Sequence, residues 1–482
     1  MEDIKFHKWR GVERLKETID SYNNILVYFD PDVDGMISGY FICKYLESLG
    51  KEYYYYVNPN RSHDWGISIS NRDVIAVDFK ITKDIILGLV KDGVNIISID
   101  HHVNQDARII VNWKGKSGVV INNQYPFEED DGRYLSGAGV VFETLRLLDP
   151  KFDTEENRAL VGLTLLSDVC DIENPNARGY LSTLYNHKYK GYIKYLISSV
   201  MGDKDYGFGV PRMDRRFVDF KFSPSINSSL RFNKGEEVIR FFLRQGSVDL
   251  TCHARQKILV QAMQEVARVR EFSHLILVFV YDWEVQTDED ISLLSNFIGL
   301  IASRYLDRGK SVLAYLISTD DDGERYIVRA SFRGHVSSGN YLGGFNKLDE
   351  DMIGIGHPPA FGVKNFFPTK ELIEKINELC SRVDDDNIPL SKITPVSNLS
   401  VFSAGEGKRY AEHNMYCLSQ SSYYVRYIGS NIKVKVDRPT FQKYLVDGIE
   451  VLSFDKELTF ADGLIYPIYE RGYLYYYLQR EE

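Results

Sequence analysis

The sequence predicts an α/β protein in which a parallel-sheet domain is joined by a long helix to a smaller α/β domain, with a small β-rich module after it. Three observations support this. Apolar runs alternate with helical stretches in the first part of the chain, which is typical of a parallel sheet. A similar alternation returns after residue 273, and residues 390–482 are rich in tyrosine and β-branched residues.

Composition and size are those of a globular protein. The chain has 482 residues, enough for two or three domains, of which 44% are hydrophobic and 26% charged. Its five cysteines lack CxxC spacing, so we expect reduced thiols in a cytoplasmic protein rather than a zinc ribbon or a disulfide framework. No apolar run approaches the ~18 residues of a membrane span, and we expect no membrane association. The net charge of -10 gives no global attraction to nucleic acid, although a local groove or bound cations could provide one.

The first domain is expected over residues 1–225. A helix is expected at 8–20, and apolar strands at 25–29, 52–57, 74–77 and 95–99. Short helices between the strands would make them parallel, and parallel sheets bind ligands beyond the carboxyl ends of their strands. Three strands release acids or histidines at that end, namely Asp30, Asp32 and Asp34 after the first, Asp78 after the third, and Asp100, His101 and His102 after the fourth.

These side chains predict a site for divalent cations. Three carboxylates on alternate residues of the DPDVDG turn repel one another, so such a turn usually needs a cation. Oxygen and imidazole ligands together suit Mn²⁺ or Mg²⁺ better than structural zinc. Asp168 joins the group because it lies on a mostly apolar helix, and buried acids are normally paired or bound to metal. Taken singly, each member has a structural alternative, which is a solvated turn for 30–35 and for the histidines and a helix N-cap for Asp78.

The rest of the chain is expected to contain a connector, a second domain and a module. Residues 226–272 would form the connector, with one amphipathic helix over 236–270. The second domain, 273–382, would contain strands and helices at 275–280, 292–307, 311–318, 325–332 and 369–383. The acidic run at 383–389 is interpreted as a linker. Residues 390–482 fit an ordinary two-faced sheet.

The motifs resemble those of the DHH phosphoesterase family, and more closely those of its RecJ-like exonuclease branch, over roughly residues 20–382. The matching segments are DPDVDG (30–35), Asp78, DHH (100–102), GAGVV (137–141), SDV (167–169), SPSINSSLRF (223–232), IGLIASR (298–304), RASFRG (329–334) and GIGHPPAFG (354–362). The chain departs from the family's pattern in three places. Tyr28 stands where relatives often have histidine, Phe79 and Lys80 replace small polar residues, and Ile355 replaces the first glycine of the usual GGH.

The resemblance implies a metal-dependent phosphodiester hydrolase with two Mn²⁺ or Mg²⁺ ions that activate a water. The implied metal ligands are Asp30, Asp32, Asp34, Asp78, His101 and Asp168. The implied catalytic group is Asp34, Asp100, His101 and His102, in which Asp100 would orient the histidines and His102 would contact the scissile phosphate. The residues expected to hold the substrate strand are Arg61, His63, Asn227, Arg231, Arg333, Gly356 and His357. For residues 390–482, the family resemblance implies an oligonucleotide-binding barrel as the alternative to an ordinary sheet.

The predicted activity is a 5′ to 3′ exonuclease that releases mononucleotides from single-stranded DNA, in a cleft between the two domains that excludes a duplex. The resemblance implies a role in recombination or repair, with a single-strand-binding protein or a replication or repair protein as partner, and we expect a monomer. Two alternatives remain open. Other DHH branches hydrolyse short oligonucleotides or cyclic dinucleotides at the same metal centre, and some replication relatives keep the fold as non-catalytic scaffolds.

Overall fold

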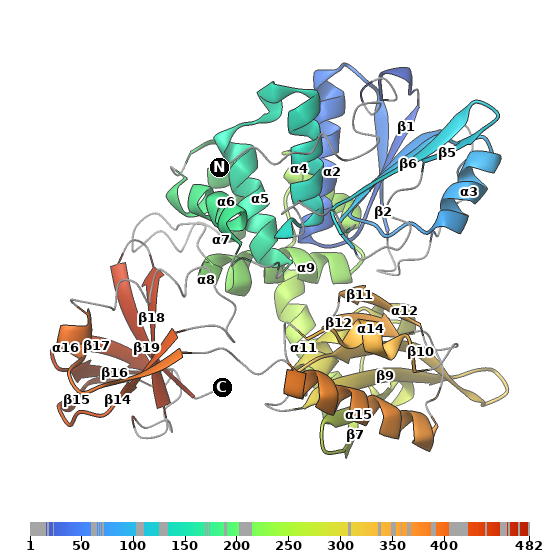
Figure 1. Ribbon diagram of the computed structural model, residues 1–482. Coiled ribbons are helices and arrows are strands. Elements are labelled where there is room, and N and C mark those ends of the chain that lie inside the picture. Colours follow the sequence, from blue (N-terminus) through green and yellow to red (C-terminus); the bar gives the residue numbers. More distant parts are fainter. Residues whose placement is uncertain are drawn as a thin grey trace. The chain divides into compact units, whose positions relative to one another are not determined.

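The structure is a computed structural model of residues 1–482 (Figure 1). It describes residues 16, 19–22, 24–58, 65, 67, 69, 72–102, 110–124, 134–168, 170, 172, 174–187, 190–201, 215–306, 310–335, 339–348, 353–357, 359–363, 367, 369–386, 392–403, 423–438, 441–453, 460, 463–470 and 473–480. The chain divides into two compact units, the first made of Met1–Cys170 and Gly179–Asp386 and the second of Asp171–Arg178 and Asn387–Glu482. The domain boundaries proposed inside the first unit stay predictions.

The first unit contains the predicted parallel sheet. Its strand order is β2-β1-β3-β4-β6-β5, with bounds β1 (Ile25–Phe29), β2 (Tyr53–Val57), β3 (Asp73–Val77), β4 (Ile96–Asp100), β5 (Ile110–Trp113) and β6 (Lys116–Asn122). All neighbouring strands are parallel except β5 and β6, which form an antiparallel pair at one edge. β1, β3 and β4 are buried along their whole length, which explains their continuous apolar sequence.

Helices α2 (Val33–Ser48), α3 (Lys83–Lys91) and α4 (Gly137–Leu148) each follow a strand and pack on this sheet. Three further helices follow α4 along the chain, namely α5 (Glu155–Ser167), α6 (Pro175–Asn186) and α7 (Gly191–Met201). α2, α4 and α5 pack against one another, whereas α3 packs on β5 and β6 (Figure 1). Gly39 lets α2 approach β1, because a Cβ there would lie 2.8 Å from the Phe29 ring. The helix expected at 8–20 falls almost entirely outside the described residues.

The connector differs from the prediction. It consists of α8 (Arg215–Phe217), a π-helical turn η5 (Val218–Phe222), α9 (Ser223–Arg231), α10 (Gly235–Phe242) and α11 (Thr251–Glu265). The single helix predicted for 236–270 is therefore wrong. The chain turns at Arg244, whose φ is 58°, and Gly246 follows; Asp249 Oδ1 then accepts the Thr251 N–H (2.9 Å) where α11 begins.

A second sheet follows in the same unit, in the order β11-β12-β10-β9-β8-β7. Its strands are β7 (Arg268–Glu271), β8 (Leu275–Tyr281), β9 (Ser311–Thr319), β10 (Arg325–Arg333), β11 (Gly354–His357) and β12 (Ala360–Val363). β8 and β9 are parallel, and the other pairs are antiparallel. Two apolar cores flank the sheet, one shared with α11 and one with the last helix of the unit.

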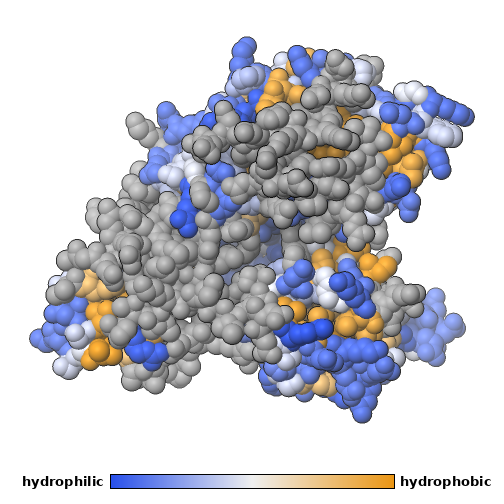
Figure 2. Space-filling model, in the orientation of Figure 1, coloured by the Kyte–Doolittle hydropathy of each residue, from blue (hydrophilic) through white to orange (hydrophobic). Residues whose placement is uncertain are grey.

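The helices of this second sheet are α12 (Ile291–Ser295), α13 (Ile298–Arg304), α14 (Tyr341–Phe345) and α15 (Lys370–Asp386). The single helix expected at 292–307 is two helices, because the chain breaks at Asn296, whose side-chain amide donates to the Arg231 carbonyl (3.0 Å). α15 includes the start of the acidic run that was interpreted as a linker. The region around α15 and β7 presents a largely hydrophilic surface (Figure 2).

The second unit is a β-rich module, as predicted. Its sheet has the order β13-β14-β18-β19-β17-β16-β15. The elements are β13 (Lys392–Val396), α16 (Leu399–Phe402), β14 (Tyr423–Tyr427), β15 (Ile432–Arg438), β16 (Phe441–Val446), β17 (Ile449–Ser453), β18 (Gly463–Glu470) and β19 (Tyr473–Arg480). Its core includes Val425, Val451 and Ile465. Among the described residues of both units, no helix is long and apolar enough to cross a membrane.

Candidate metal centre

The turn after β1 holds its three aspartates in different environments. Asp30 and Asp34 are buried, whereas Asp32 is half-buried. Asp32 is the N-cap of α2, and its Oδ1 accepts the Gly35 N–H at 2.9 Å. Gly35 is required by a close approach, because a Cβ there would lie 2.3 Å from the Asp30 carbonyl oxygen. One predicted ligand, Asp32, thus already has a structural role.

Asp34 connects two helices that are distant in sequence. Its Oδ2 accepts the Gly137 N–H (2.6 Å) and its Oδ1 the Ala138 N–H (3.0 Å), both at the start of α4. The positive end of a helix dipole favours an anion at this place. Burial nevertheless raises the pKa of Asp34 to about 7, and the nearby charge of Asp168 adds to the effect. The carboxyl groups around Asp34 therefore cannot all ionise at low cost unless a cation joins them.

Asp78 ends β3 in a strained conformation. Its φ is 52°, in the left-handed region that is uncommon for residues other than glycine. Its side chain is 2% exposed, and Oδ1 accepts no hydrogen bond from the described part of the chain. Burial raises the pKa of Asp78 well above its usual range, with the charge of Asp34 as the next cause. α4 starts with a glycine beside it, because a Cβ on Gly137 would lie 2.3 Å from Asp78 Oδ1.

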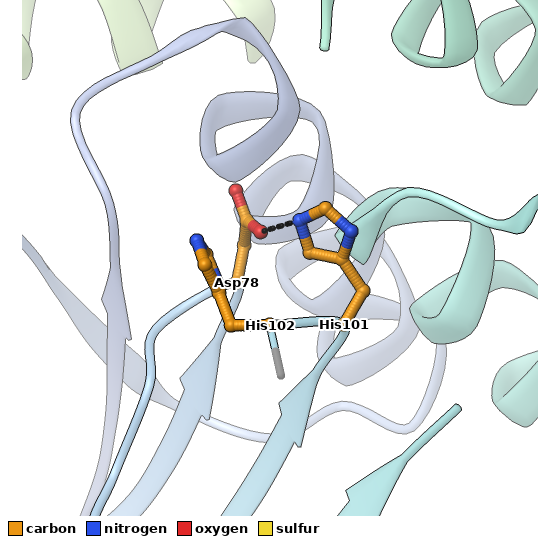
Figure 3. A group of neighbouring side chains, drawn as sticks. All are labelled: Asp78, His101 and His102. Carbon is orange, nitrogen blue, oxygen red and sulfur yellow. Dashed lines mark ion pairs between the residues drawn. The ribbon is translucent and has the colours of Figure 1, made fainter. Parts of the chain in front are cut away.

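His101 lies beside three of the predicted carboxylate ligands. Its Nε2 lies 3.3 Å from Asp78 Oδ1, 3.5 Å from Asp168 Oδ2 and 3.8 Å from Asp34 Oδ2. Figure 3 shows the ion pair with Asp78, and the two side chains come from the ends of neighbouring strands β3 and β4. Asp168 is the C-cap residue of α5. Three of the predicted carboxylate ligands thus lie around the ring nitrogen of a fourth predicted ligand, His101.

His102 is held by Asp100. His102 Nδ1 lies 2.7 Å from Asp100 Oδ1, and both side chains are buried. Burial acts to raise the pKa of Asp100, but the charge and hydrogen bond of His102 outweigh it and lower the pKa to about 2. Ligand atoms of His102, His101 and Asp78 lie within 4.8 Å of one another. Asp100 is therefore an anion that fixes the orientation of His102 at the edge of the cluster.

Cys170 is a member of the cluster that the sequence prediction missed. Ligand atoms of Cys170, Asp168 and His101 lie within 4.8 Å of one another, and the Cys170 thiol donates to Asp168 Oδ2 at 3.4 Å. Burial, with the charge of Asp168, raises the pKa of this thiol well above its usual value. Its position two residues after Asp168 is the available signal, whereas the cysteine spacing alone predicts only reduced thiols.

Two of the predicted strand-binding residues lie on α9. Asn227 Oδ1 is buried and has no hydrogen-bond partner in the described part of the chain. Arg231 donates through Nη1 to the buried Gln256 Oε1 of α11 (3.1 Å). Arg231 therefore lies where α9 packs on α11. Arg61 and His63 lie outside the described residues.

The other predicted strand-binding residues lie on the second sheet. Arg333 at the end of β10 donates to Ser331 Oγ (2.9 Å) and to the Phe332 carbonyl (2.7 Å). In the strand register, Arg333 and His357 both face Ala360 of β12, so they occupy one row across three strands. The His357 backbone belongs to β11, and its side chain is outside the described set. Gly356 beside it has a φ of 144°, which favours glycine.

The donor set of the cluster fits a divalent cation. Carboxylate oxygens of Asp34 in the first turn of α2, Asp78 after β3 and Asp168 at the end of α5 lie 3.3–3.8 Å from His101 Nε2. Their mutual repulsion and burial raise the pKa values of Asp34 and Asp78, and Asp78 Oδ1 lacks a hydrogen bond among the described residues. A bound cation would reverse each of these costs. Mn²⁺ and Mg²⁺ are the ions that such oxygen-rich ligands favour.

Comparisons with known proteins agree with this arrangement. Residues 24–167 match the N-terminal domain of the DHH family. The chain is 23% identical over 445 residues to the single-stranded-DNA-specific exonuclease RecJ of Bacillus subtilis, a match that covers 84% of this chain and 51% of that protein. It is 25% identical over 446 residues to the putative SPbeta prophage-derived single-strand DNA-specific exonuclease YorK of the same organism, covering 80% of this chain and 72% of YorK.

A solved structure shows the same fold. The crystal structure of RecJ in complex with Mn²⁺ from Thermus thermophilus matches with a TM-score of 0.63 at 16% identity, covering 98% of this chain and 72% of that one. The chain spans about half the length of the B. subtilis RecJ that it matches. The expected resemblance is confirmed: residues 24–167 match the N-terminal domain of the DHH family, and the whole chain resembles RecJ proteins in sequence and in fold.

Proposed function

We propose that this protein is a divalent-metal-dependent phosphodiesterase that degrades single-stranded DNA as an exonuclease. The observation that carries the proposal is the convergence of Asp34, Asp78 and Asp168 on His101 Nε2. The names of the relatives support the type of substrate, because both matched B. subtilis proteins are described as single-strand-specific exonucleases. The 5′ to 3′ polarity, the release of mononucleotides, the monomeric state and the single-strand-binding or repair partner stay predictions.

The proposed ions are two Mn²⁺ or Mg²⁺. The residues that would hold them are Asp30, Asp32, Asp34, Asp78, His101 and Asp168. Bound there, divalent cations supply Lewis-acid activation of a water and neutralise charge that develops on the phosphate. Asp34 has both oxygens engaged by backbone N–H groups of α4, so it keeps a fixed position from which its remaining lone pairs can face a cation.

The chain's own residues would orient the phosphate. Asp100 engages His102 Nδ1 and so orients the ring, and His102 would contact a non-bridging phosphate oxygen. Arg333 is aligned by Ser331 and its fork of donors suits a phosphate further along the strand. Arg231 is aligned by Gln256 in the same way. Arg61, His63, Asn227, Gly356 and His357 complete the proposed strand-binding set.

A nuclease assay on single Asp→Asn variants tests the proposal. The substrate is end-labelled single-stranded DNA with Mn²⁺, and the variant is Asp78→Asn, which keeps the side-chain size and tolerates a positive φ. We expect a loss of rate on the order of 100-fold or more, because a metal ligand disappears. Asp84→Asn, on the exposed side of α3, is the matched control and should keep wild-type activity.

The same assay separates the other functions. Equal rates on dinucleotides and on a long oligonucleotide would favour a short-oligonucleotide phosphodiesterase over an exonuclease on long strands. Wild-type protein that binds Mn²⁺ and cleaves neither substrate would contradict the proposal, and wild-type protein that binds no metal would favour a scaffold. Full activity of Asp78→Asn would show that the metal assignment is wrong.

A further inference from the structure

We propose that Cys170 gives this centre a second mode of metal binding, in which His101, Asp168 and Cys170 hold one thiophilic divalent ion such as Zn²⁺, Co²⁺ or Cd²⁺. The inference rests on the metal centre of the proposed function, but it does not depend on nuclease activity. It concerns which ions the centre accepts. Neither Mn²⁺ nor Mg²⁺ would call for a sulfur ligand, because both prefer oxygen donors.

The geometry of the three donors matches a tetrahedral site. Bonds of ~2.0–2.3 Å to a tetrahedral ion put ligand atoms ~3.3–3.8 Å apart. Cys170 Sγ lies 3.4 Å from Asp168 Oδ2, and Asp168 Oδ2 lies 3.5 Å from His101 Nε2. Ligand atoms of all three residues lie within 4.8 Å of one another. Small side-chain movements would therefore bring the third pair of donors into range.

Asp78 is a further donor beside His101, although its ligand atoms group with His101 and His102 rather than with Asp168 and Cys170. Asp78 is 2% exposed, its Oδ1 accepts no hydrogen bond within the described part of the chain, and this oxygen lies 3.3 Å from His101 Nε2. That separation also fits the edge of a tetrahedron around a small ion. The Cys170 group itself supplies one sulfur, one nitrogen and one oxygen. Such a mixed set is suited to borderline-soft ions rather than to Mg²⁺.

Binding in this mode is a ligand exchange without electron transfer. The Cys170 S–H bond breaks, its proton passes to the buffer, and the sulfur donates an electron pair to the ion. The ion takes His101 and Asp168, which the proposed Mn²⁺ site also uses. Because affinities for such donor sets rise from Mn²⁺ towards Co²⁺ and the later ions, the thiophilic ion should displace Mn²⁺. The centre would then hold an ion with its sulfur ligand in place of the oxygen-rich arrangement.

Cobalt spectroscopy on the full chain tests the inference. Metal-free wild-type protein titrated with one equivalent of Co²⁺ should show visible ligand-field bands and a near-ultraviolet sulfur-to-cobalt charge-transfer band. Cys170→Ala should lose the charge-transfer band and keep visible bands. Cys380→Ala, at a buried cysteine of α15, is the matched control and should keep both. A wild-type protein without the charge-transfer band, or a Cys170→Ala variant that retains it, would overturn the proposal.

A second measurement needs no variant. X-ray absorption of wild-type protein loaded with one equivalent of Zn²⁺ should show a sulfur neighbour at about 2.3 Å, whereas nitrogen and oxygen neighbours alone, at ~2.0–2.2 Å, would overturn the inference. The outcomes separate from those of the nuclease assay. A Cys170-dependent cobalt band in a protein that lacks Mn²⁺-dependent cleavage would support this inference and contradict the proposed function. Mn²⁺-dependent cleavage without the band would do the opposite.

Discussion

Two buried acids in the first unit, Glu143 and Asp78, differ in the groups that surround them. Glu143 of α4 is 2% exposed, and Arg146 contacts its Oε2 at 2.6 Å while the Tyr180 hydroxyl donates to its other oxygen. Asp78 is equally buried, but other carboxyl groups surround it instead of an arginine. Its Oδ1 accepts no hydrogen bond from the described residues.

The difference shows which acids the fold satisfies by itself. A buried carboxylate costs several kcal/mol unless a cation or donors compensate it. The group around Glu143 contains its own cation, whereas the described residues around Asp78 supply histidine and further acids. The first group is therefore complete as a structural element, and the second is complete only with an ion.

The largest expected effect is that of metal removal. Chelation should abolish cleavage of end-labelled single-stranded DNA, and added Mn²⁺ should restore it, because the acid cluster cannot hold its charged form without a cation. The metal content of the chelated protein should be measured in parallel. Cleavage that persists in protein shown to be metal-free would contradict the need of the acids around Asp78 for a cation.

On the structural side, Arg146→Met should lower the free energy of unfolding by about 3 kcal/mol, because it leaves Glu143 buried without its cation. Urea unfolding monitored by circular dichroism measures this. The control is Arg240→Met, which removes an exposed ion pair with Glu236 on α10 and should leave the free energy of unfolding nearly unchanged. Equal losses in the two variants would show that burial of the pair does not decide its contribution.

The pH dependence of stability should differ with and without metal. The folded-state pKa of Asp34 is raised from 3.8 to about 7, and Asp78 shifts in the same direction. A carboxyl group whose pKa is raised on folding stabilises the folded state most at pH values below its unfolded-state pKa. This stabilisation is lost as the pH rises from about 4 through 7. Metal-free protein should therefore lose stability over that range, on the order of 4 kcal/mol from Asp34, because one unit of pKa shift corresponds to about 1.4 kcal/mol. Unfolding free energies measured with saturating Mn²⁺ should not show this loss, and identical profiles would contradict the account.

The smallest effect concerns the second sheet. A Cβ on Gly299 of α13 would lie 2.6 Å from Arg333 Nη2, so Gly299→Ala should displace this arginine from its place beside Ser331. We expect KM for single-stranded DNA to rise about tenfold with kcat little changed, since a strand contact away from the metal centre is lost. Gly88→Ala is the matched control, because nothing lies within 4 Å of a Cβ there. A fall in kcat alone would place Arg333 in the chemical step instead.

Much of the candidate centre could be predicted from local sequence. Apolar strands that end in Asp78 and in DHH share one edge because neighbouring strands β3 and β4 are parallel, a rule that needs no knowledge of the side-chain contacts. The contacts of Asp34 with the α4 backbone could not be predicted, because they join residues 103 and 104 positions apart. Cys170 follows the end of α5, where no periodic pattern indicates which way a side chain points.

The wrong elements have a similar origin. The pattern over 236–270 is amphipathic throughout, so periodicity alone gave one helix, whereas the turn at Arg244 and the contact of Asp249 with α11 are decided by tertiary packing. Asn296 breaks the next predicted helix by reaching the Arg231 carbonyl, which is again a long-range contact. Local pattern predicted which segments are apolar, and tertiary contacts decided where the helices end.

Anomalous diffraction from crystals grown with Mn²⁺ tests the central claim most directly. We expect anomalous density within bonding distance of Asp78, His101 and Asp168, at the carboxyl end of the first sheet. Occupied density elsewhere, with these three side chains left as they are in the metal-free protein, would contradict it.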